Sequence, residues 1–221
     1  MLPFTHQQFV FVFSLYNAAI WPLQLIVHGA GLVMLALLLR PSRRRDFANV
    51  GLLAAMWIWT GIVYQIGFFS QINSAALAFG GLFVVEGLLL LRAARRSALR
   101  FGSARGWRRA TALALLLYSL LLYPLVGIMS GQNYFDLPAF GLTPCPVTLT
   151  TIGMLLLAAR PMPRSLYVIP VAWSVVGGSA AILLRMPQDW PLLLVPLLLA
   201  SLAVYHARRA LVHGQPRTTH V

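Results

Sequence analysis

Cys145 is the only cysteine of the chain, and it stands between two prolines directly before an apolar run. Thr143 is a good helix N-cap and Pro144 suits the first helical position, so the segment predicts a helix that begins at Pro144. The thiol then lies in the first turn, where the helix dipole favours a thiolate. Pro146 removes a further amide donor, which makes this helix end a poor phosphate site. Three interpretations of Cys145 stay open: a packing residue, a soft-metal ligand or reactive thiol, and part of a gate shaped by the prolines.

Five side chains near the N-terminus are spaced 3, 4, 3 and 4 residues apart: Ser14, Asn17, Trp21, Gln24 and His28. If one helix continues through Pro22, this spacing places them on one face. Polar groups are costly inside a membrane, so the face is expected to turn away from lipid. It either forms hydrogen bonds between helices, worth roughly 0.6 to 2 kcal/mol each, or lines a ligand site in which His28 carries a proton or binds a metal.

Two later polar residues are expected at the same depth as Cys145 and His28. Tyr64 shares a helical face with Thr60, and Asn73 begins the next apolar segment. A cavity among these residues would open to the outer side of the membrane. His28 is the best nitrogen partner for Cys145, but two ligands fall short of a zinc site.

Glu86 is the only acidic residue inside an expected span. It precedes Arg92 by six residues, or about 9 Å along a helix. One interpretation is a carboxylate that reaches the cytoplasmic interface or pairs with an arginine there. The other is a buried proton or cation site, which the neighbouring Gly87 would allow by bringing a second helix close.

The composition indicates that these residues belong to a membrane protein. The chain has 221 residues, of which 59% are hydrophobic and only 10% are charged, and its mean hydropathy is +0.79. A soluble domain of this size needs more charge on its surface. All 17 basic residues are arginines, opposed by four acids, and they fall between apolar runs of about 20 residues. This placement indicates membrane topology, and no nucleic acid partner is expected.

The apolar pattern predicts an all-α integral membrane helical bundle that forms one transmembrane domain over residues 1–221. Thr5 and Gln8 have the spacing of a capping box, which predicts a short interfacial helix at 6–20. A single kinked helix through Pro22 is the alternative. Seven spans follow, at about 22–39, 49–68, 72–91, 110–129, 144–159, 166–185 and 191–207.

The arginines predict the orientation of these spans. They concentrate in the loops 40–48, 92–109 and 160–165 and in the tail 208–221, while the alternate loops lack them except for Arg185 at one edge. The positive-inside rule then places the N-terminus outside and the C-terminus inside. The segment 92–109 is expected to form an amphipathic surface helix, with Phe101 and Trp107 touching lipid. Tyr64 and Tyr123 are expected in the aromatic belts.

Several segments resemble a family of bacterial polytopic membrane proteins of unknown function. The resemblance rests on PFT…QF…YN…WP at the N-terminus, on TPCP at 143–146 and on GGSAA…PQD at 177–189, and it extends over nearly the whole chain. It implies a membrane fold but no activity. The residues it nominates are Tyr16, Asn17, Trp21, Pro22, Asn73, Thr143, Pro144, Cys145, Pro146, Gln188 and Asp189.

The sequence favours a transporter or binding protein in the bacterial inner membrane, with a site open to the outer side. Its ligand would be a small molecule or a soft metal ion. The candidate binding residues are Asn17, Trp21, Gln24, His28, Tyr64, Asn73, Glu86, Thr143 and Cys145, with Cys145 and His28 as the metal candidates. No motif names a cofactor, and none of the common hydrolase or nucleotide-binding motifs is present. Besides the lipid bilayer, a second copy of the chain is a candidate partner.

Two functions of other classes are the alternatives. The first is a membrane enzyme at the outer interface, with Asp136 or Asp189 as the general base. The second is a structural or assembly protein without a ligand.

Overall fold

The computed structural model describes residues 3–96, 100–102, 104–159, 163 and 165–201. Within these residues the regular structure is helical, and the one β-type pairing is an isolated bridge between Phe101 and Ala158. The tail 208–221, the end of the seventh predicted span and parts of the loops 92–109 and 160–165 lie outside the described residues.

The N-terminal region forms two helices rather than one. α1 (His6–Ala19) and α2 (Leu23–Leu39) meet at an angle of 86°, with Pro22 in the break. The predicted capping box is confirmed, because the Thr5 side chain accepts a hydrogen bond from the Gln8 amide and the Gln8 side chain accepts one from the Thr5 amide. Ser14 and Asn17 therefore lie on a different helix axis from Gln24 and His28, so the single polar face expected through Pro22 does not exist.

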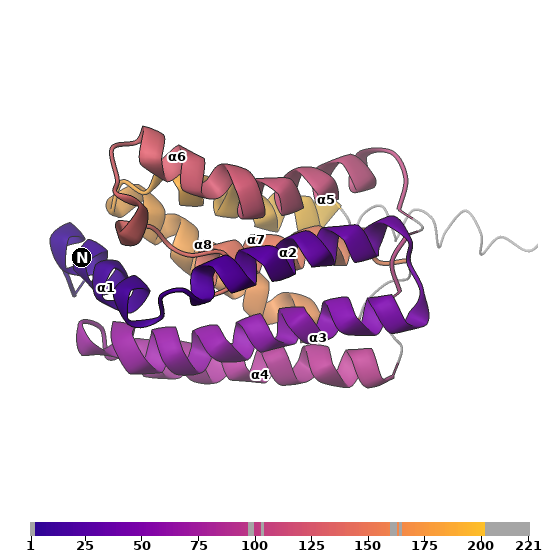
Figure 1. Cartoon of the computed structure of the whole chain (residues 1–221), viewed down its shortest axis with the longest axis horizontal. Helices are drawn as coiled ribbons and strands as arrows, with labels where there is room; N and C mark the ends of the chain where they lie inside the picture. The colour runs from indigo at the N-terminus through magenta and orange to yellow at the C-terminus, as the bar shows by residue number, and fades with distance from the viewer. Residues whose placement is uncertain (1–2, 97–99, 103, 160–162, 164, 202–221) are drawn as a thin grey trace, which may run out of the picture.

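The next segments form a tightly packed helical hairpin (Figure 1). α3 (Arg43–Trp59) continues through the π-helix η1 (Thr60–Phe68) and the short 3₁₀ helix η2 (Phe69–Gln71), and α4 (Ala76–Arg95) returns beside it. Glycines allow the close approach: a Cβ on Gly61 would lie 2.7 Å from the Gly80 carbonyl oxygen, and one on Gly87 would lie 2.9 Å from that of Ala54. Gly80 therefore packs against η1 and Gly87 against α3, so the close helix approach expected at Gly87 is present.

The second half of the chain contributes two further long helical segments. α5 (Trp107–Leu117), the π-helix η3 (Tyr118–Leu122) and α6 (Tyr123–Met129) form one continuous 23-residue segment, and α8 (Ser165–Leu183) is the other. A loop with the short helix η4 (Tyr134–Asp136) leads into α7 (Pro144–Leu157), and η5 (Pro187–Leu194) leads into a helix that begins at residue 195.

Four described helical segments are long and apolar enough to cross a membrane, and α1 with α2 makes a fifth if the bent pair counts as one span. Helix covers most of the described residues of each of the seven predicted spans, but residues 72–75, 158–159 and 184–185 lie outside the helices. α7 has only 14 residues, and the seventh predicted span is described only as far as residue 201, so neither is shown as a full crossing.

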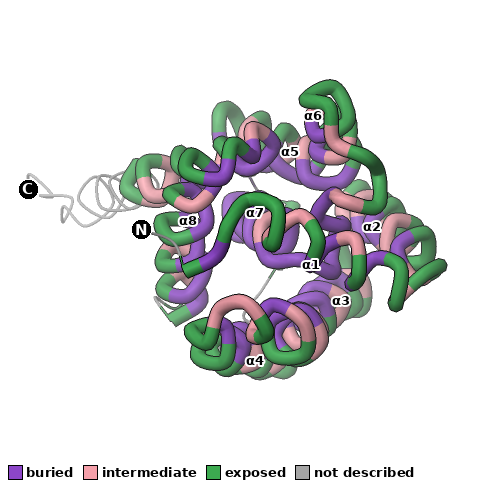
Figure 2. The backbone as a smooth tube through the Cα atoms, turned by 90° about the vertical axis from the view of Figure 1, so that its left-hand side faces the viewer, coloured by how far each residue is buried: buried purple, intermediate pink, exposed green. Residues whose placement is uncertain are grey.

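α7 occupies the centre of the bundle, and the other helices surround it (Figure 2). Every residue of α7 except Cys145 is buried. Its C-terminal end is held by Arg108, whose guanidinium donates to the carbonyl oxygens of Leu156 at 3.0 Å and Ala158 at 2.9 Å. A cation at a helix C-terminus also interacts favourably with the helix dipole.

The expected surface helix at 92–109 is wrong in its central part. Phe101 is only 7% exposed, and its neighbour Arg100 accepts a hydrogen bond from the Ala159 amide at 2.7 Å. This segment pairs with the end of α7 because α7 ends inside the protein and its last backbone groups need partners. Trp107, at the start of α5, is 42% exposed.

The glycine contacts generate a stability prediction. Gly80→Ala places a methyl group 2.8 Å from the Gly61 carbonyl oxygen, so the helices must separate. We expect a loss of about 1 to 3 kcal/mol of stability, measured by thermal unfolding in detergent. Gly81→Ala is the matched control, because nothing lies within 4 Å of its added methyl group. Equal melting temperatures for the two variants would contradict this packing.

Candidate functional site

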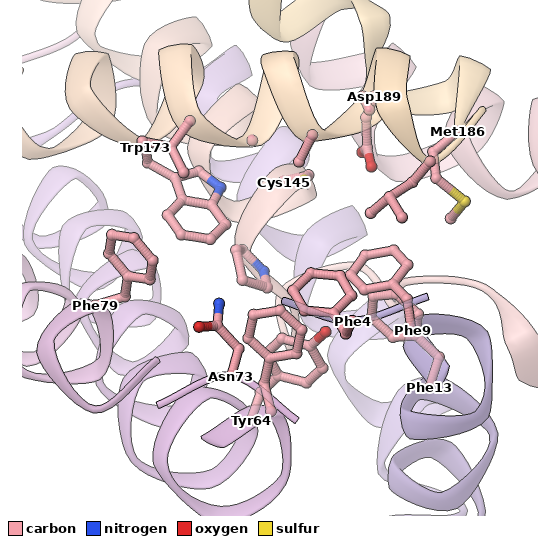
Figure 3. Close-up of a pocket in the computed structure, with 17 residues that line it drawn as sticks. Phe4, Phe9, Phe13, Tyr64, Asn73, Phe79, Cys145, Trp173, Met186 and Asp189 are labelled. Atoms are coloured by element: carbon pink, nitrogen blue, oxygen red, sulfur yellow. The ribbon is translucent and has the colours of Figure 1, made fainter. Parts of the chain in front are cut away.

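A cavity of about 80 Å³ lies at the end of the bundle where α1 crosses the other helices (Figure 3). We call it the aromatic cavity, because seven aromatic side chains line it: Phe4, Phe9, Phe13, Tyr64, Phe69, Phe79 and Trp173. Asn73, Pro144, Cys145, Met186 and Asp189 are among the other lining residues. A volume of this size holds on the order of five water molecules, or one small organic molecule.

The aromatic wall comes from segments far apart in the sequence. Phe9 and Phe13 lie one turn apart on α1, with ring centroids 4.9 Å apart. The Tyr64 ring of η1 stacks on Phe13 at 5.3 Å and on Phe69 at 5.8 Å. Tyr64 is 2% exposed, so its predicted place in an aromatic belt is wrong. The wider turn of the π-helix places residues five apart on one face, which brings Thr60 and Gln65 inward together with Tyr64.

The opposite side of the cavity carries the polar groups. Cys145 lies partly exposed at the start of α7, next to the Trp173 indole and the Asp189 carboxyl group. Tyr123 donates a hydrogen bond from its hydroxyl to Asp189. Tyr123 is 1% exposed, so it too lies inside the protein rather than in the expected belt.

Asp189 is the titratable group of this site that lies outside the long helical segments. Burial raises the pKa of its carboxyl group to about 7, although the hydrogen bonds from Tyr123 and Cys145 act in the opposite direction. At neutral pH the group therefore lies near the midpoint of its titration. A carboxyl group that titrates in this range can donate a hydrogen bond to a bound molecule when protonated and accept one when ionised.

Thr143 has the predicted position but not the predicted bond. It is the residue before α7, with extended backbone, yet its side chain makes no cap hydrogen bond to the helix. An N-cap side chain usually accepts a hydrogen bond from the backbone amide two or three residues further on. The third residue after Thr143 is Pro146, which has no amide hydrogen. The Thr143 hydroxyl donates instead to the Ala139 carbonyl oxygen at 2.8 Å, which braces the preceding loop.

Asn17, Gln24 and His28 gather around a different and smaller cavity of about 20 Å³. The Asn17 amide donates to the carbonyl oxygens of Phe135 at 2.7 Å and Leu137 at 2.8 Å. The Gln24 amide donates to the Asn17 carbonyl oxygen at 2.7 Å, and Nδ1 of His28 lies 2.9 Å from the Gln24 carbonyl oxygen. These bonds fasten the loop before α7 to α1 and across the α1–α2 break.

Further residues of α1 and of the α1–α2 break strengthen the same attachment. Ser14 donates to Asp136, and the Tyr16 hydroxyl donates to the Leu142 carbonyl oxygen at 2.8 Å. Trp21 is 49% exposed and packs edge-on against Phe135. Of the residues that the family resemblance nominates, Tyr16, Asn17, Trp21 and Thr143 therefore hold the loop that supports the start of α7.

Of the nine candidate binding residues, the structure brings three to the aromatic cavity: Tyr64, Asn73 and Cys145. Glu86 lies elsewhere, fully buried in α4. Cys145 and His28 line separate cavities, and no group of three or more His, Cys, Asp or Glu side chains in the described residues could hold a metal ion. The general-base candidates have different surroundings: Asp189 lines the aromatic cavity and bonds to Tyr123, whereas Asp136 bonds to Ser14 and Asn133 and does not line that cavity.

The sequence interpretation missed the phenylalanines and Trp173. Phe9 and Phe13 have helical spacing, and Phe69 lies at the same expected depth, so a concentration of aromatic residues near one membrane face was the available signal. Such a pattern is also typical of lipid-facing surfaces, and only the fold shows that these rings enclose a space.

The model of a family of unknown function, DUF6064, matches residues 6–213. The chain belongs to this family. The match confirms the resemblance to a family of unknown function. No curated protein and no solved structure matches the chain significantly.

Asp189 generates a pH prediction. Its pKa is about 7 in the folded chain and near 3.9 in an unfolded chain, so the folded state binds the proton more tightly. The stabilisation of the folded state by this group is fully present below about pH 4. It is lost as the pH rises through 7, and the free energy of unfolding falls by up to about 4 kcal/mol. The melting temperature in detergent should therefore fall from pH 5 to pH 8. Asp189→Asn should remove most of this decrease, and an unchanged decrease in that variant would exclude Asp189 as its source.

Proposed function

We propose that the protein is a bacterial inner-membrane transporter or binding protein that takes up a small organic molecule in the aromatic cavity. It crosses the membrane seven times, with the N-terminus outside and the C-terminus inside. The spans are α2, the α3–η2 segment, α4, the α5–α6 segment, α7, α8 and the helix that begins at residue 195.

The distribution of charge supports this orientation. α2, α4 and the α5–α6 segment each carry arginines at or beside one end, and the described arginines other than Arg185 lie at this end of the bundle. Because arginine-rich loops face the cytoplasm, the opposite end, with α1 and the aromatic cavity, faces outward. Arg185 is the one exception among the described arginines, as it is in the charge pattern of the predicted loops.

The observation that carries the proposal is the aromatic cavity. Small-molecule sites combine an apolar, aromatic wall with a few polar groups that orient the ligand. Here the wall consists of the seven aromatic rings, and Asn73, Cys145 and Asp189 are the polar groups. The separation of Cys145 from His28 favours an organic ligand over a soft metal ion, because a metal site needs its ligands around one point.

Labelling of the single cysteine tests this site directly. A membrane-impermeant maleimide added to intact spheroplasts should modify Cys145 from outside. Ala180→Phe, which fills the cavity from α8, should slow the reaction at least tenfold, equivalent to about 1.4 kcal/mol. Small aromatic compounds such as indole should protect the thiol at millimolar concentration.

The matched control is Ala78→Phe, the same change at an exposed position of α4. It should leave the labelling rate unchanged. A thiol that reacts only from the cytoplasmic side, or a rate that Ala180→Phe does not lower, would contradict an outward-facing cavity.

The orientation has its own test by reporter fusion. A reporter that is active only in the cytoplasm should be active after residue 100, and a reporter that is active only outside should be active after residue 135. The arginines near residue 100 and their absence from 130–143 are the physical reason. Reversed activities would overturn the orientation and place the aromatic cavity on the cytoplasmic side.

A further inference from the structure

Glu86 lies in the middle of α4, among residues that pack against other helices. Its side chain is 0% exposed, and neither carboxyl oxygen has a hydrogen-bond partner among the described residues. A glutamate without a functional role would be exposed at the interface or paired with an arginine. Among the described residues, Glu86 is neither exposed nor paired with an arginine. An isolated buried carboxylate costs many kcal/mol, so such a group carries a proton.

Three more buried side chains without partners lie on the segment that packs against α4. Asn49 in α3 and Thr60 and Gln65 in η1 are each 0% exposed, and none of their side-chain polar atoms has a hydrogen-bond partner. Glycine contacts give the register of the two helices, since Gly87 meets Ala54 and Gly61 meets Gly80. Glu86 is then level with residue 55. Asn49 lies about 9 Å away along the axis, and Thr60 and Gln65 lie about 7.5 Å and about 15 Å away on the opposite side.

Most other buried polar side chains of the described residues make at least one hydrogen bond, although Asn17, Gln24 and Gln188 each keep one unpartnered oxygen and the Trp173 indole nitrogen has no partner. Trp57 donates to the Thr151 hydroxyl at 2.8 Å, and the Ser119 and Thr150 hydroxyls lie 3.0 Å apart. Thr148 donates to a carbonyl oxygen within α7 at 2.8 Å. Apart from Trp173, the buried polar side chains that lack any partner among the described residues are thus Glu86, Asn49, Thr60 and Gln65, on α3, η1 and α4. Buried polar atoms without a protein partner are the usual sites of bound water.

The charged and titratable groups around α4 leave Glu86 without a counterion. α3 contributes Asp46 and Arg43–Arg45, η1 contributes Tyr64, α8 contributes Tyr167, and α4 itself carries Arg92 and Arg95 at its end. The ion pair found among the described residues joins Asp46 to Arg100 at 3.8 Å. Asp46, at the arginine-rich end, and Gln65, beside Tyr64 of the aromatic cavity, mark the two ends of this row of polar groups.

We propose that Glu86 is a proton-binding site inside the membrane, and that bound water along Asn49, Thr60 and Gln65 connects it to the aqueous phase. The ligand of this site is the proton, which adds to the carboxylate and leaves it again through hydrogen-bonded water. The proposal rests on the α3–α4 contact and not on the aromatic cavity, so either can fail without the other.

The sequence offers a direct probe, because Glu86 is the only glutamate of the chain. Protein made with ¹³C-carboxyl glutamate by cell-free synthesis and placed in lipid nanodiscs gives an isotope-shifted infrared band from this one group. We expect the band of a protonated carboxyl at pH 7, and we expect it to shift within minutes of transfer to D₂O. Glu86→Gln, made with the same label, supplies the background spectrum.

The route is tested by removing its polar groups. Asn49→Leu and Gln65→Leu together should slow the exchange at least tenfold, equivalent to about 1.4 kcal/mol. Thr150→Val is the control, because Thr150 bonds to the Pro146 carbonyl oxygen and to Ser119 and lies outside the row. A carboxylate band at pH 7, a band that does not shift in D₂O over hours, or equal rates in the double variant and the control would overturn the proposal. The first two measurements use the unmodified protein, so they stand even if the double variant does not fold.

Discussion

The burial of α7 is the constraint on which the rest of the structure depends. Its 14 residues span about 21 Å, well short of a hydrocarbon core of about 30 Å, and all but Cys145 are buried by other helices. Backbone groups at its two ends need partners inside the protein, because neither water nor lipid reaches them there. Arg108 and the residue 100–102 segment supply them at one end. At the other end, two prolines remove amide donors and leave a space that aromatic side chains enclose.

The polar residues inside the bundle divide into three groups with different consequences. Asn17 and Gln24 use their hydrogen-bonding capacity to fix the loop before α7, which makes them supports of the site. Cys145 and Asp189 face the aromatic cavity, where a ligand can contact them. Glu86, Asn49, Thr60 and Gln65 make no side-chain hydrogen bond among the described residues and do not line the aromatic cavity. The proposed proton site and the proposed ligand cavity would together be the two components that a proton-coupled transporter requires.

Much of the fold follows from local pattern, and most of the site does not. The capping box at Thr5 and the start of α7 at Pro144 depend on adjacent residues, so the sequence predicts them correctly. The apolar runs depend on bilayer thickness, and four or five of the described helical segments have the predicted length and composition of a span. The polar face through Pro22 failed because the chain turns by 86° there. The pairing of Asp189 with Tyr123 and the enclosure of Tyr64 by Phe13 join residues more than 50 positions apart. No spacing rule predicts such contacts, since only the packing of helices brings them together.

An experimental density map of the protein in native-lipid nanodiscs, at a resolution that shows side chains, is the most direct test of the aromatic cavity. We expect a space between Trp173, Cys145 and Tyr64 at the end of the bundle opposite the arginines, with density in it that no side chain explains. A map in which Phe13 and Met186 turn inward and fill this space would contradict the proposed binding site.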